Sequence, residues 1–304
     1  MTGPVKRVLI IADIEGSSGC WSYEASRFLT KPWAEACARM SLDAAAVATA
    51  LFEAGAEKVI VKDFHRTAYN LLPELIDPRA KVVHGYRAGP VPGLGDPEDA
   101  QGVMFLGLHA ASGTEGFLAH TLTSRISSLE VDGRPLAEVE LFSAALAGHG
   151  IRPLFFSGCE KACLQARERL PGLAVLPLDK SGGPDRVDLK AWRQSLALAA
   201  AQALRNDAAP PYSPPGPFRA RMVMRDGPKA ARKIARRWGL EAQGDAIVVE
   251  APDQRALFVE LARLVYLTPF LNRILPVSLF CYRILGKIGL AWAGAQLRKG
   301  CPDV

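Results

Sequence analysis

The sequence predicts an α/β fold in which a largely parallel sheet is flanked by helices and a smaller α+β portion follows toward the C-terminus. Short, continuous apolar runs alternate with stretches of helical period as far as residue 205, and this alternation is typical of parallel sheets. A proline-rich stretch, residues 206–217 (NDAAPPYSPPGP), interrupts the pattern. Such a stiff connector indicates a boundary between two structural units.

The strands before the connector are predicted from continuous apolar runs, which indicate strands buried on both faces. The first run reads VKRVLIIAD, residues 5–13. Further runs of this kind lie at residues 58–63, 80–85, 102–109, 152–158 and 173–178. We therefore expect one sheet built from strands that are well separated along the chain.

Helical periods lie between these runs. Residues 32–56 predict a long helix that ends at Gly55, and shorter helices are expected over 159–170 and 188–205. Residues 126–140 predict a strand, an Asp132–Gly133 turn and a helix that begins near Pro135. After the connector, strands are expected at 218–224 and 246–251, with helices over 229–237 and 253–267.

Composition supports a large folded protein. The chain has 304 residues, of which 49% are hydrophobic and 22% charged, so a sizeable core is expected and long disordered segments are not. Its six cysteines include no CxxC pair, which favours a reduced, cytoplasmic protein over a disulfide framework. Lys6 and Arg7 lead directly into the first strand, and we expect no secretory leader.

The net charge of +6 is concentrated near the C-terminus. Residues 218–304 contain 15 Lys and Arg against 7 Asp and Glu, and the excess is greatest in KAARKIARR, residues 229–237. Such a segment is either a nucleic-acid or anionic-surface patch, or the solvated face of an amphipathic helix. No aromatic or glycine-rich nucleic-acid motif accompanies it, so the second interpretation is favoured and no nucleic-acid partner is expected. The inward residues would then be Ala231, Ile234, Ala235 and Trp238.

The last segment, residues 269–304, is apolar and basic. Arg273, Arg283 and Lys287 leave no uncharged run of 18 residues, which argues against a transmembrane span. Phe280, Ile284, Ile288 and Trp292 recur near helical spacing. Two interpretations follow: a helix lying in a membrane interface as a peripheral contact, or one packed on the protein itself or a neighbouring subunit, which is the commoner outcome.

Polar side chains follow three of the predicted strands. They are Asp13 and Glu15, Asp63 and His65, and His109; His120, Glu138 and Glu140 come next in the chain. In proteins with parallel sheets, ligands bind at the carboxyl ends of the strands, which meet at one edge of the sheet. The side chains that follow these strands are therefore expected to converge there. Carboxylates and imidazoles together suit a divalent metal, zinc first and then manganese or cobalt.

The absence of cysteine from this set favours a catalytic over a structural zinc site. Taken singly, each residue also has a structural interpretation. Asp13 and Glu15 could cap a turn, His65 could be a loop histidine, and His109 a core one. Taken together at strand ends, they favour a metal centre.

Several motifs resemble those of one known family. ADIEG, DFHRTAYNLLPE, FLGLHAASGTEGFLAHT and VDGRPLAEVEL are similar, in order and spacing, to the motifs of the M55 metallopeptidases, the D-aminopeptidase family. The resemblance is strong over residues 5–165 and looser to about 268. It implies a di-zinc aminopeptidase that removes D-residues such as D-alanine from short peptides, and a ring-shaped homo-oligomer, such as a decamer, that encloses the active sites.

The resemblance also implies roles for individual residues. Asp13 matches the carboxylate that bridges the two ions. Glu15 and His65 match the remaining ligands of one zinc, and His109 and Glu138 those of the other. His120 matches a histidine that acts in catalysis without binding metal.

This chain departs from the family pattern beside the expected ligands. Lys62, Phe64 and Arg66 surround His65 where other residues are usual, and Glu140 and Phe142 follow Glu138 in the same way. Lys180 is kept in a second-half motif that is otherwise replaced. These changes imply an altered pocket, and the tail from residue 269 has no counterpart in the family.

The expectation is thus a metal-binding catalytic α/β domain over 1–185, a smaller domain over 186–268 and the tail 269–304. The expected activity is that of a zinc-dependent aminopeptidase acting on peptides with an N-terminal D-amino acid. Two alternatives are a metal-dependent amidase or deacylase acting on another small amide, and a non-catalytic scaffold on the same fold.

Overall fold

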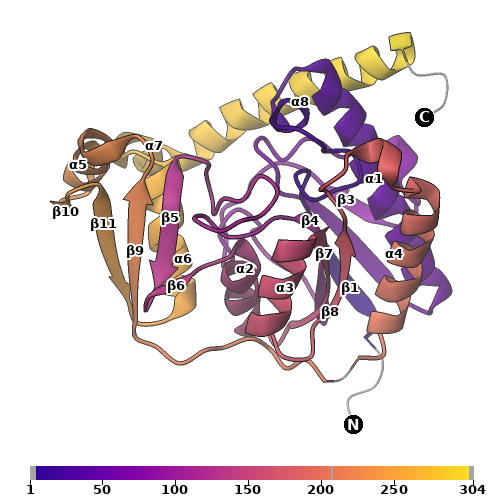
Figure 1. Cartoon of the computed structure of the whole chain (residues 1–304), viewed down its shortest axis with the longest axis horizontal. Helices are drawn as coiled ribbons and strands as arrows, with labels where there is room; N and C mark the ends of the chain where they lie inside the picture. Colours follow the sequence, from indigo (N-terminus) through magenta and orange to yellow (C-terminus); the bar gives the residue numbers. More distant parts are fainter. Residues whose placement is uncertain (1–4, 207, 301–304) are drawn as a thin grey trace.

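The computed structural model describes residues 5–206 and 208–300 and contains two separate sheets (Figure 1). The first has six parallel strands in the order β3-β2-β1-β4-β7-β8. The predicted α/β class, with its parallel sheet and smaller second part, is confirmed. The strands of this sheet are β1 (Arg7–Ala12), β2 (Lys58–Asp63), β3 (Lys81–Val83), β4 (Gly102–Leu108), β7 (Arg152–Cys159) and β8 (Ala174–Leu178).

The second sheet has five strands in the order β10-β11-β9-β5-β6 and its pairings are antiparallel. It joins segments from before and after the proline-rich connector, because β5 (Ile126–Val131) pairs with β9 (Phe218–Met224). The other strands are β6 (Arg134–Pro135), β10 (Ala242–Gln243) and β11 (Ala246–Ala251).

The hairpin between β5 and β6 corrects one expectation. Asp132 and Gly133 form the predicted turn, with φ of 52° and 77°, as a tight hairpin requires. The helix expected from Pro135 begins instead at Glu138, since Arg134 and Pro135 pair with β5 at the edge of the sheet. An edge position suits proline, which lacks an N–H to donate.

Helices cover both faces of the parallel sheet. The long helix α1 (Lys31–Glu53) and α4 (Leu189–Ala203) pack together on one face, and α2 (Glu138–Ala147) and α3 (Glu160–Arg169) lie on the other. The second sheet carries α5 (Gly227–Arg237) and α6 (Gln254–Tyr266). Helix α4, which follows residue 185, packs against α1, β7 and β8. Residues on both sides of position 185 therefore belong to the layers of the parallel sheet and its helices.

Strand β1 shows how the two cores are built. Its side chains alternate: Leu9 and Ile11 enter the core shared with the second sheet, while Val8 and Ile10 enter the core beneath α1. All four are at most 2% exposed. Because both faces of the strand are buried, the sequence shows a continuous apolar run and no polar alternation.

The start and end of α1 follow from local chemistry. Thr30 accepts a hydrogen bond from the Trp33 N–H and caps the helix, and Pro32 occupies its first turn. Gly55, with φ of 97°, follows its end as predicted. The Trp33 indole N–H donates to Asn70 (2.9 Å), which ties α1 to the loop that follows β2.

The C-terminal residues form α7 (Pro269–Arg273) and one long helix, α8 (Leu275–Gly300). Residues 275–299 are long and apolar enough to cross a membrane, although Arg283 and Lys287 had argued against a span. Only 11% of the tested window is buried inside the protein. Length and composition do not distinguish a span from a helix that lies on a surface.

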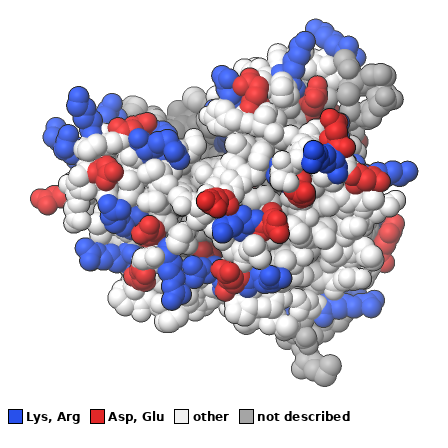
Figure 2. Space-filling view, viewed as in Figure 1, with Lys and Arg blue, Asp and Glu red and all other residues white. Residues whose placement is uncertain are grey.

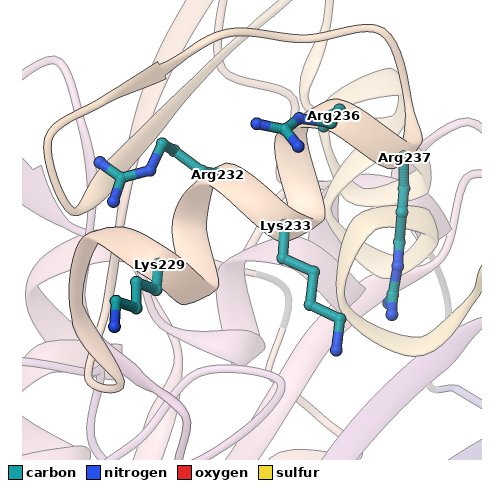
Figure 3. Close-up of a pocket in the computed structure, with 5 residues that line it drawn as sticks. All are labelled: Lys229, Arg232, Lys233, Arg236 and Arg237. Atoms are coloured by element: carbon teal, nitrogen blue, oxygen red, sulfur yellow. The ribbon is translucent and has the colours of Figure 1, made fainter.

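Basic residues gather over the second sheet. In Figure 2 they are dense on the left of the molecule, where Figure 1 shows α5, β10 and β11. Five of them project from α5 in Figure 3: Lys229, Arg232, Lys233, Arg236 and Arg237. The opposite side of this helix is buried through Ala231, Ile234 and Ala235, so its predicted amphipathic character is confirmed.

Candidate metal centre

The predicted ligands converge at the carboxyl ends of β1, β2 and β4. They form two groups whose oxygen and nitrogen atoms lie within 4.8 Å of one another, Asp13 with Glu15 and His65, and His109 with His120 and Glu138. Parallel strands present their carboxyl ends at one edge, which brings residues 13, 65 and 109 together. Glu138 arrives separately, as the first residue of α2.

Asp13 lies between the two groups. Its Oδ1 is 3.3 Å from His65 Nδ1, and its Oδ2 is 3.5 Å from His109 Nε2. The Ile14 N–H donates to Oδ1 (2.8 Å) and holds the carboxylate in this orientation. Each oxygen therefore faces a histidine of a different group.

The first group is completed by Glu15 and His65. Glu15 Oε2 is 2.9 Å from His65 Nδ1. The other ring nitrogen of His65, Nε2, lies 2.9 Å from the carbonyl oxygen of Ser26, to which it must donate because a carbonyl only accepts. This hydrogen bond orients the His65 ring so that Nδ1 faces the carboxylates. Histidines that bind metal commonly donate their other ring N–H to a carbonyl in the same way.

The second group is arranged in a similar way. His109 Nδ1 donates to the carbonyl oxygen of Ala110 (3.2 Å), while Nε2 lies 3.8 Å from Glu138 Oε1. The Leu122 N–H donates to the same Glu138 oxygen (2.7 Å). His120 Nδ1 donates to the carbonyl oxygen of Leu118 (2.8 Å), and its ring stacks on that of His109.

Two buried polar atoms of the site make no hydrogen bond. They are Glu15 Oε2 and His109 Nε2, one in each group. Glu15 Oε2 does lie 2.9 Å from His65 Nδ1, but the proton of the neutral His65 ring is on Nε2, which donates to the Ser26 carbonyl. Leaving a buried polar atom unsatisfied costs about 1–3 kcal/mol, so the two atoms point to a missing partner. A metal ion that accepts carboxylate and imidazole ligands would satisfy both, and the donor set suits zinc.

The ionisation of the site reflects its crowded charges. Burial alone would raise the pKa of Asp13, but the neighbouring imidazoles of His109 and His65 hold it well below its usual value. Burial alone would lower the pKa of His65, yet Glu15 and Asp13 raise it well above its usual value. Burial opposes the same change at His109, where Glu138 and Asp13 raise the pKa to about 10. Metal binding at such a site would release protons, because imidazole and carboxylate groups bind metal only in their deprotonated forms.

The loop that carries His65 is held by Asp63. This carboxylate accepts hydrogen bonds from the N–H of His65 (3.2 Å), the N–H of Leu71 (3.1 Å) and the side-chain amide of Asn70 (2.9 Å). Asn70 Nδ2 also donates to the His65 carbonyl (2.7 Å). Asp63, one of the strand-end carboxylates, is thereby occupied within the loop and lies outside both ligand groups.

A glycine allows β4 to approach the Asp13 loop. Gly107 has φ of 74°, and a Cβ atom there would lie 2.2 Å from the carbonyl oxygen of Asp13. The Gly16 N–H donates to the Gly107 carbonyl (2.7 Å). A side chain at residue 107 would push the two strand ends apart, and with them Asp13 and His109.

Glu140 faces away from the ligands. Its Oε2 accepts a hydrogen bond from the Ala137 N–H (3.0 Å), and its Oε1 accepts one from the Tyr212 hydroxyl (3.2 Å). Arg169 lies 3.9 Å from the same Oε1. The residue therefore closes the first turn of α2, as carboxylates at that position commonly do.

Two of the unusual residues beside the ligands pack against each other. The rings of Phe64 and Phe142 meet edge to face, with centroids 4.4 Å apart. Lys62 is fully buried and donates to the Gly85 carbonyl. These three side chains therefore take part in packing within the protein. Arg66 is exposed, and its carbonyl accepts a hydrogen bond from the Tyr282 hydroxyl (3.2 Å).

Two further residues near the site were not predicted. The Tyr266 hydroxyl, at the end of α6, donates to the carbonyl of Leu122, the residue that holds Glu138. Lys180 donates to the carbonyl of Cys20 (2.6 Å) and thus supports the loop after Glu15. Lys180 was recognised in the sequence only as part of a motif, and nothing in the local pattern around Tyr266 indicates its position.

Comparison with known proteins identifies the family. The model of peptidase family M55, described as D-aminopeptidase, matches residues 6–258. The chain belongs to the M55 peptidase family. As a member of this family it is an enzyme, an aminopeptidase of the hydrolase class.

A known protein and a solved structure that are similar to this M55 peptidase are both described as D-aminopeptidases. The chain is 28% identical over 205 residues to a D-aminopeptidase of Bacillus subtilis (strain 168), covering 65% of this chain and 70% of that protein. Its fold is similar to that of a solved structure described as the Zn-dependent D-aminopeptidase DppA from Bacillus subtilis, a self-compartmentalizing protease. That match has a TM-score of 0.75 and 21% identity, and it covers 84% of this chain and 96% of the other. Helices α7 and α8 follow the family match.

Proposed function

We propose that this M55 peptidase is a zinc-dependent aminopeptidase that removes N-terminal D-amino acids, such as D-alanine, from short peptides. The position of Asp13 between the two ligand groups is the observation that carries the metal assignment, since its two oxygens face His65 and His109. The substrate class rests on the family and on the names of its relatives.

We further propose two zinc ions in each subunit. Asp13 would contact both ions, Glu15 and His65 would complete the ligands of one, and His109 and Glu138 those of the other. When bound, zinc lowers the pKa of water and polarises a carbonyl oxygen. The two unpartnered atoms, Glu15 Oε2 and His109 Nε2, support one ion in each group.

His120 is the proposed catalytic residue. Its Nδ1 donates to the Leu118 carbonyl, so Nε2 is the ring atom left to exchange a proton or donate a hydrogen bond. His120 is less buried than His109 and therefore more open to a substrate. It would either hydrogen-bond the oxyanion that develops on the scissile carbonyl or carry the proton from the attacking water to the leaving amine.

Glu138 and His109 have supporting roles in this proposal. The Leu122 N–H holds Glu138 in position, and the Tyr266 hydroxyl fixes the Leu122 carbonyl from the other side. The stacked ring of His109 limits the tilt of His120. His120, the proposed proton carrier, is thus positioned by His109, which would itself be held by the metal.

The assembly and location are also proposals. A homo-oligomer that encloses its active sites is supported by the structural relative, which is described as self-compartmentalizing. We propose that this chain forms such a ring in the cytoplasm. The alternative of a metal-dependent amidase or deacylase acting on another small amide rests on the residues that depart from the family pattern, Lys62, Phe64, Arg66, Glu140 and Phe142.

The function is tested with metal-depleted protein reconstituted with zinc. Matched D- and L-aminoacyl dipeptides are supplied, and release of the N-terminal residue is measured. We expect turnover of D-alanyl peptides, little turnover of the L-forms, and loss of activity after chelation that added zinc reverses. The Asp13→Ala variant serves as the inactive control. Equal turnover of both stereoisomers would exclude the proposed specificity, and a zinc-loaded protein that cleaves no aminoacyl peptide would exclude the activity.

A further inference from the structure

Helix α8 is fixed to the protein through one of its faces. A Cβ atom at Gly286 would lie 2.2 Å from the ring of Tyr69, and one at Gly289 would lie 2.2 Å from the ring of Phe28. Trp292 stacks on Trp33 of α1, with ring centroids 6.1 Å apart. The glycines therefore let the helix lie directly on aromatic side chains of the body, and this face is already occupied.

The opposite face of α8 is apolar and exposed. Val277, Phe280, Ile284 and Ile288 follow one another at spacings of three and four residues, which places them on one side of the helix. Their exposed fractions are 57%, 58%, 45% and 59%. Figure 1 shows α8 running along the edge of the molecule. A row of large apolar side chains on an outer edge indicates a surface that binds something.

The charged side chains of α7 and α8 are all positive. Residues 269–300 contain Arg273, Arg283, Lys287, Arg298 and Lys299 and no Asp or Glu. Arg283 and Lys287 are exposed and lie within the stretch of helix that carries the apolar row. Apolar residues flanked by bases are typical of helices that lie in the interface of an anionic membrane.

The charges favour lipid over a second copy of the chain. In a two-fold symmetric contact through this face, the bases of one helix would meet those of the other, with no carboxylate on α7 or α8 to separate them. A spanning helix is disfavoured by the packing, since insertion would remove Gly286, Gly289 and Trp292 from the aromatic side chains they contact.

We propose that the outer face of α8, formed by Val277, Phe280, Ile284 and Ile288 with Arg283 and Lys287 beside them, binds the surface of an anionic lipid bilayer. The apolar side chains enter the boundary between headgroups and acyl chains, and the bases contact lipid phosphates. The helix lies parallel to the bilayer and keeps its contacts with Phe28, Trp33 and Tyr69. The proposal does not depend on the substrate of the enzyme.

Binding to anionic lipid is tested by vesicle flotation of the full-length protein. Vesicles of phosphatidylcholine alone are compared with vesicles that also contain phosphatidylglycerol. We expect the protein to float with the anionic vesicles and to bind the neutral ones at least about tenfold more weakly, since each base near an anionic surface adds roughly fivefold to partitioning. Binding should weaken as salt is raised. Absence of flotation with anionic vesicles would overturn the proposal.

Two apolar double variants separate α8 from surface hydrophobicity in general. Phe280→Glu/Ile288→Glu should reduce binding to anionic vesicles at least about tenfold. Leu164→Glu/Leu198→Glu introduces the same charges at exposed apolar sites on α3 and α4 and should bind like the parent. Thermal melting confirms that both variants are folded. Equal flotation of the α8 variant and the parent would refute the role of this face.

Two charge variants separate α8 from the basic helix α5. Arg283→Glu/Lys287→Glu should abolish the preference for anionic vesicles, and Arg232→Glu/Arg236→Glu, with the same change in net charge, should retain it. The reverse result would assign lipid binding to α5 and overturn the proposal. Resistance of the protein to extraction by alkaline carbonate would show that α8 spans the membrane, and this result would also overturn the proposal. An α8 variant that changes oligomer size while the parent fails to float would assign the face to a second copy.

Discussion

The imidazole rings of His109 and His120 lie stacked, with their centroids 3.8 Å apart and their planes inclined by 12°. One ring belongs to a proposed zinc ligand and the other to the proposed proton carrier. His120, His109 and Glu138 each have one potential ligand atom, and these atoms lie within 4.8 Å of one another. Experiment must therefore separate a catalytic role of His120 from metal binding.

Replacing His120 by Ala distinguishes these roles. As a proton carrier or oxyanion donor, His120 contributes roughly 10²–10⁴-fold to turnover. The His120→Ala variant should therefore retain zinc, melt close to the parent and lose that much of kcat, with little change in KM. Elemental analysis, thermal melting and steady-state kinetics test this. A variant without zinc would make His120 a ligand, and one with normal kcat would remove it from the mechanism.

Removing Asp13 should affect both metal sites. Its oxygens lie 3.3 Å from His65 and 3.5 Å from His109, so Asp13→Ala takes a proposed ligand from each ion. Zinc content should fall well below that of the parent, whereas Glu15→Ala should lose one ion preferentially. Elemental analysis of the purified variants measures both. Unchanged zinc in Asp13→Ala would contradict the bridging role.

Glu138 and Glu140 should respond differently to substitution. Glu138→Gln removes a proposed ligand and should lower zinc content. Glu140→Gln should keep the metal, because Glu140 bonds Ala137 and Tyr212 instead of facing the site. The free energy of unfolding of this variant should change little, because the Gln oxygen can still accept the Ala137 hydrogen bond and its amide can donate to the Tyr212 hydroxyl. Zinc loss from Glu140→Gln together with zinc retention in Glu138→Gln would reverse the assignment.

Lys62 should make stability depend on pH. Burial lowers its pKa from the usual 10.5 to about 8, so between these values the unfolded chain binds more protons than the folded one. The stability of the parent relative to Lys62→Met should therefore rise with pH across this window. At pH 7 the variant should be more stable by about 2 kcal/mol.

Denaturant unfolding at pH 7 and near pH 10 measures the change. Lys190→Met, at an exposed position, is the matched control and should differ little from the parent at either pH. A stability difference between Lys62→Met and the parent that stays constant from pH 7 to pH 10 would show that Lys62 titrates normally.

Local patterns in the sequence were sufficient to predict most of the first sheet. Strand β1 and helix α1 are determined by neighbours along the chain: a continuous apolar run buried on both faces, and a Thr30 cap with Gly55 after the end. The polar residues at strand ends could be predicted to converge, because parallel strands end at one edge. Their proposed division between two ions came from resemblance to the M55 family.

Tertiary structure decided the features that depend on residues far apart in the chain. Strand β5 joins β9 across the connector, and Pro135 belongs to an edge strand instead of a helix. Helix α2 begins at Glu138, and its packing on the sheet determines where each of its side chains points. Glu138 therefore faces the site, whereas Glu140 faces Tyr212. Tyr266 reaches Leu122 across 144 residues. Such contacts leave no periodic signal, since the hydrophobic pattern reports whether a residue is buried and not which distant residue it contacts.

The same limit applies to α8. Its sequence showed an apolar helix, but only packing against Phe28, Trp33 and Tyr69 determined which face remains exposed.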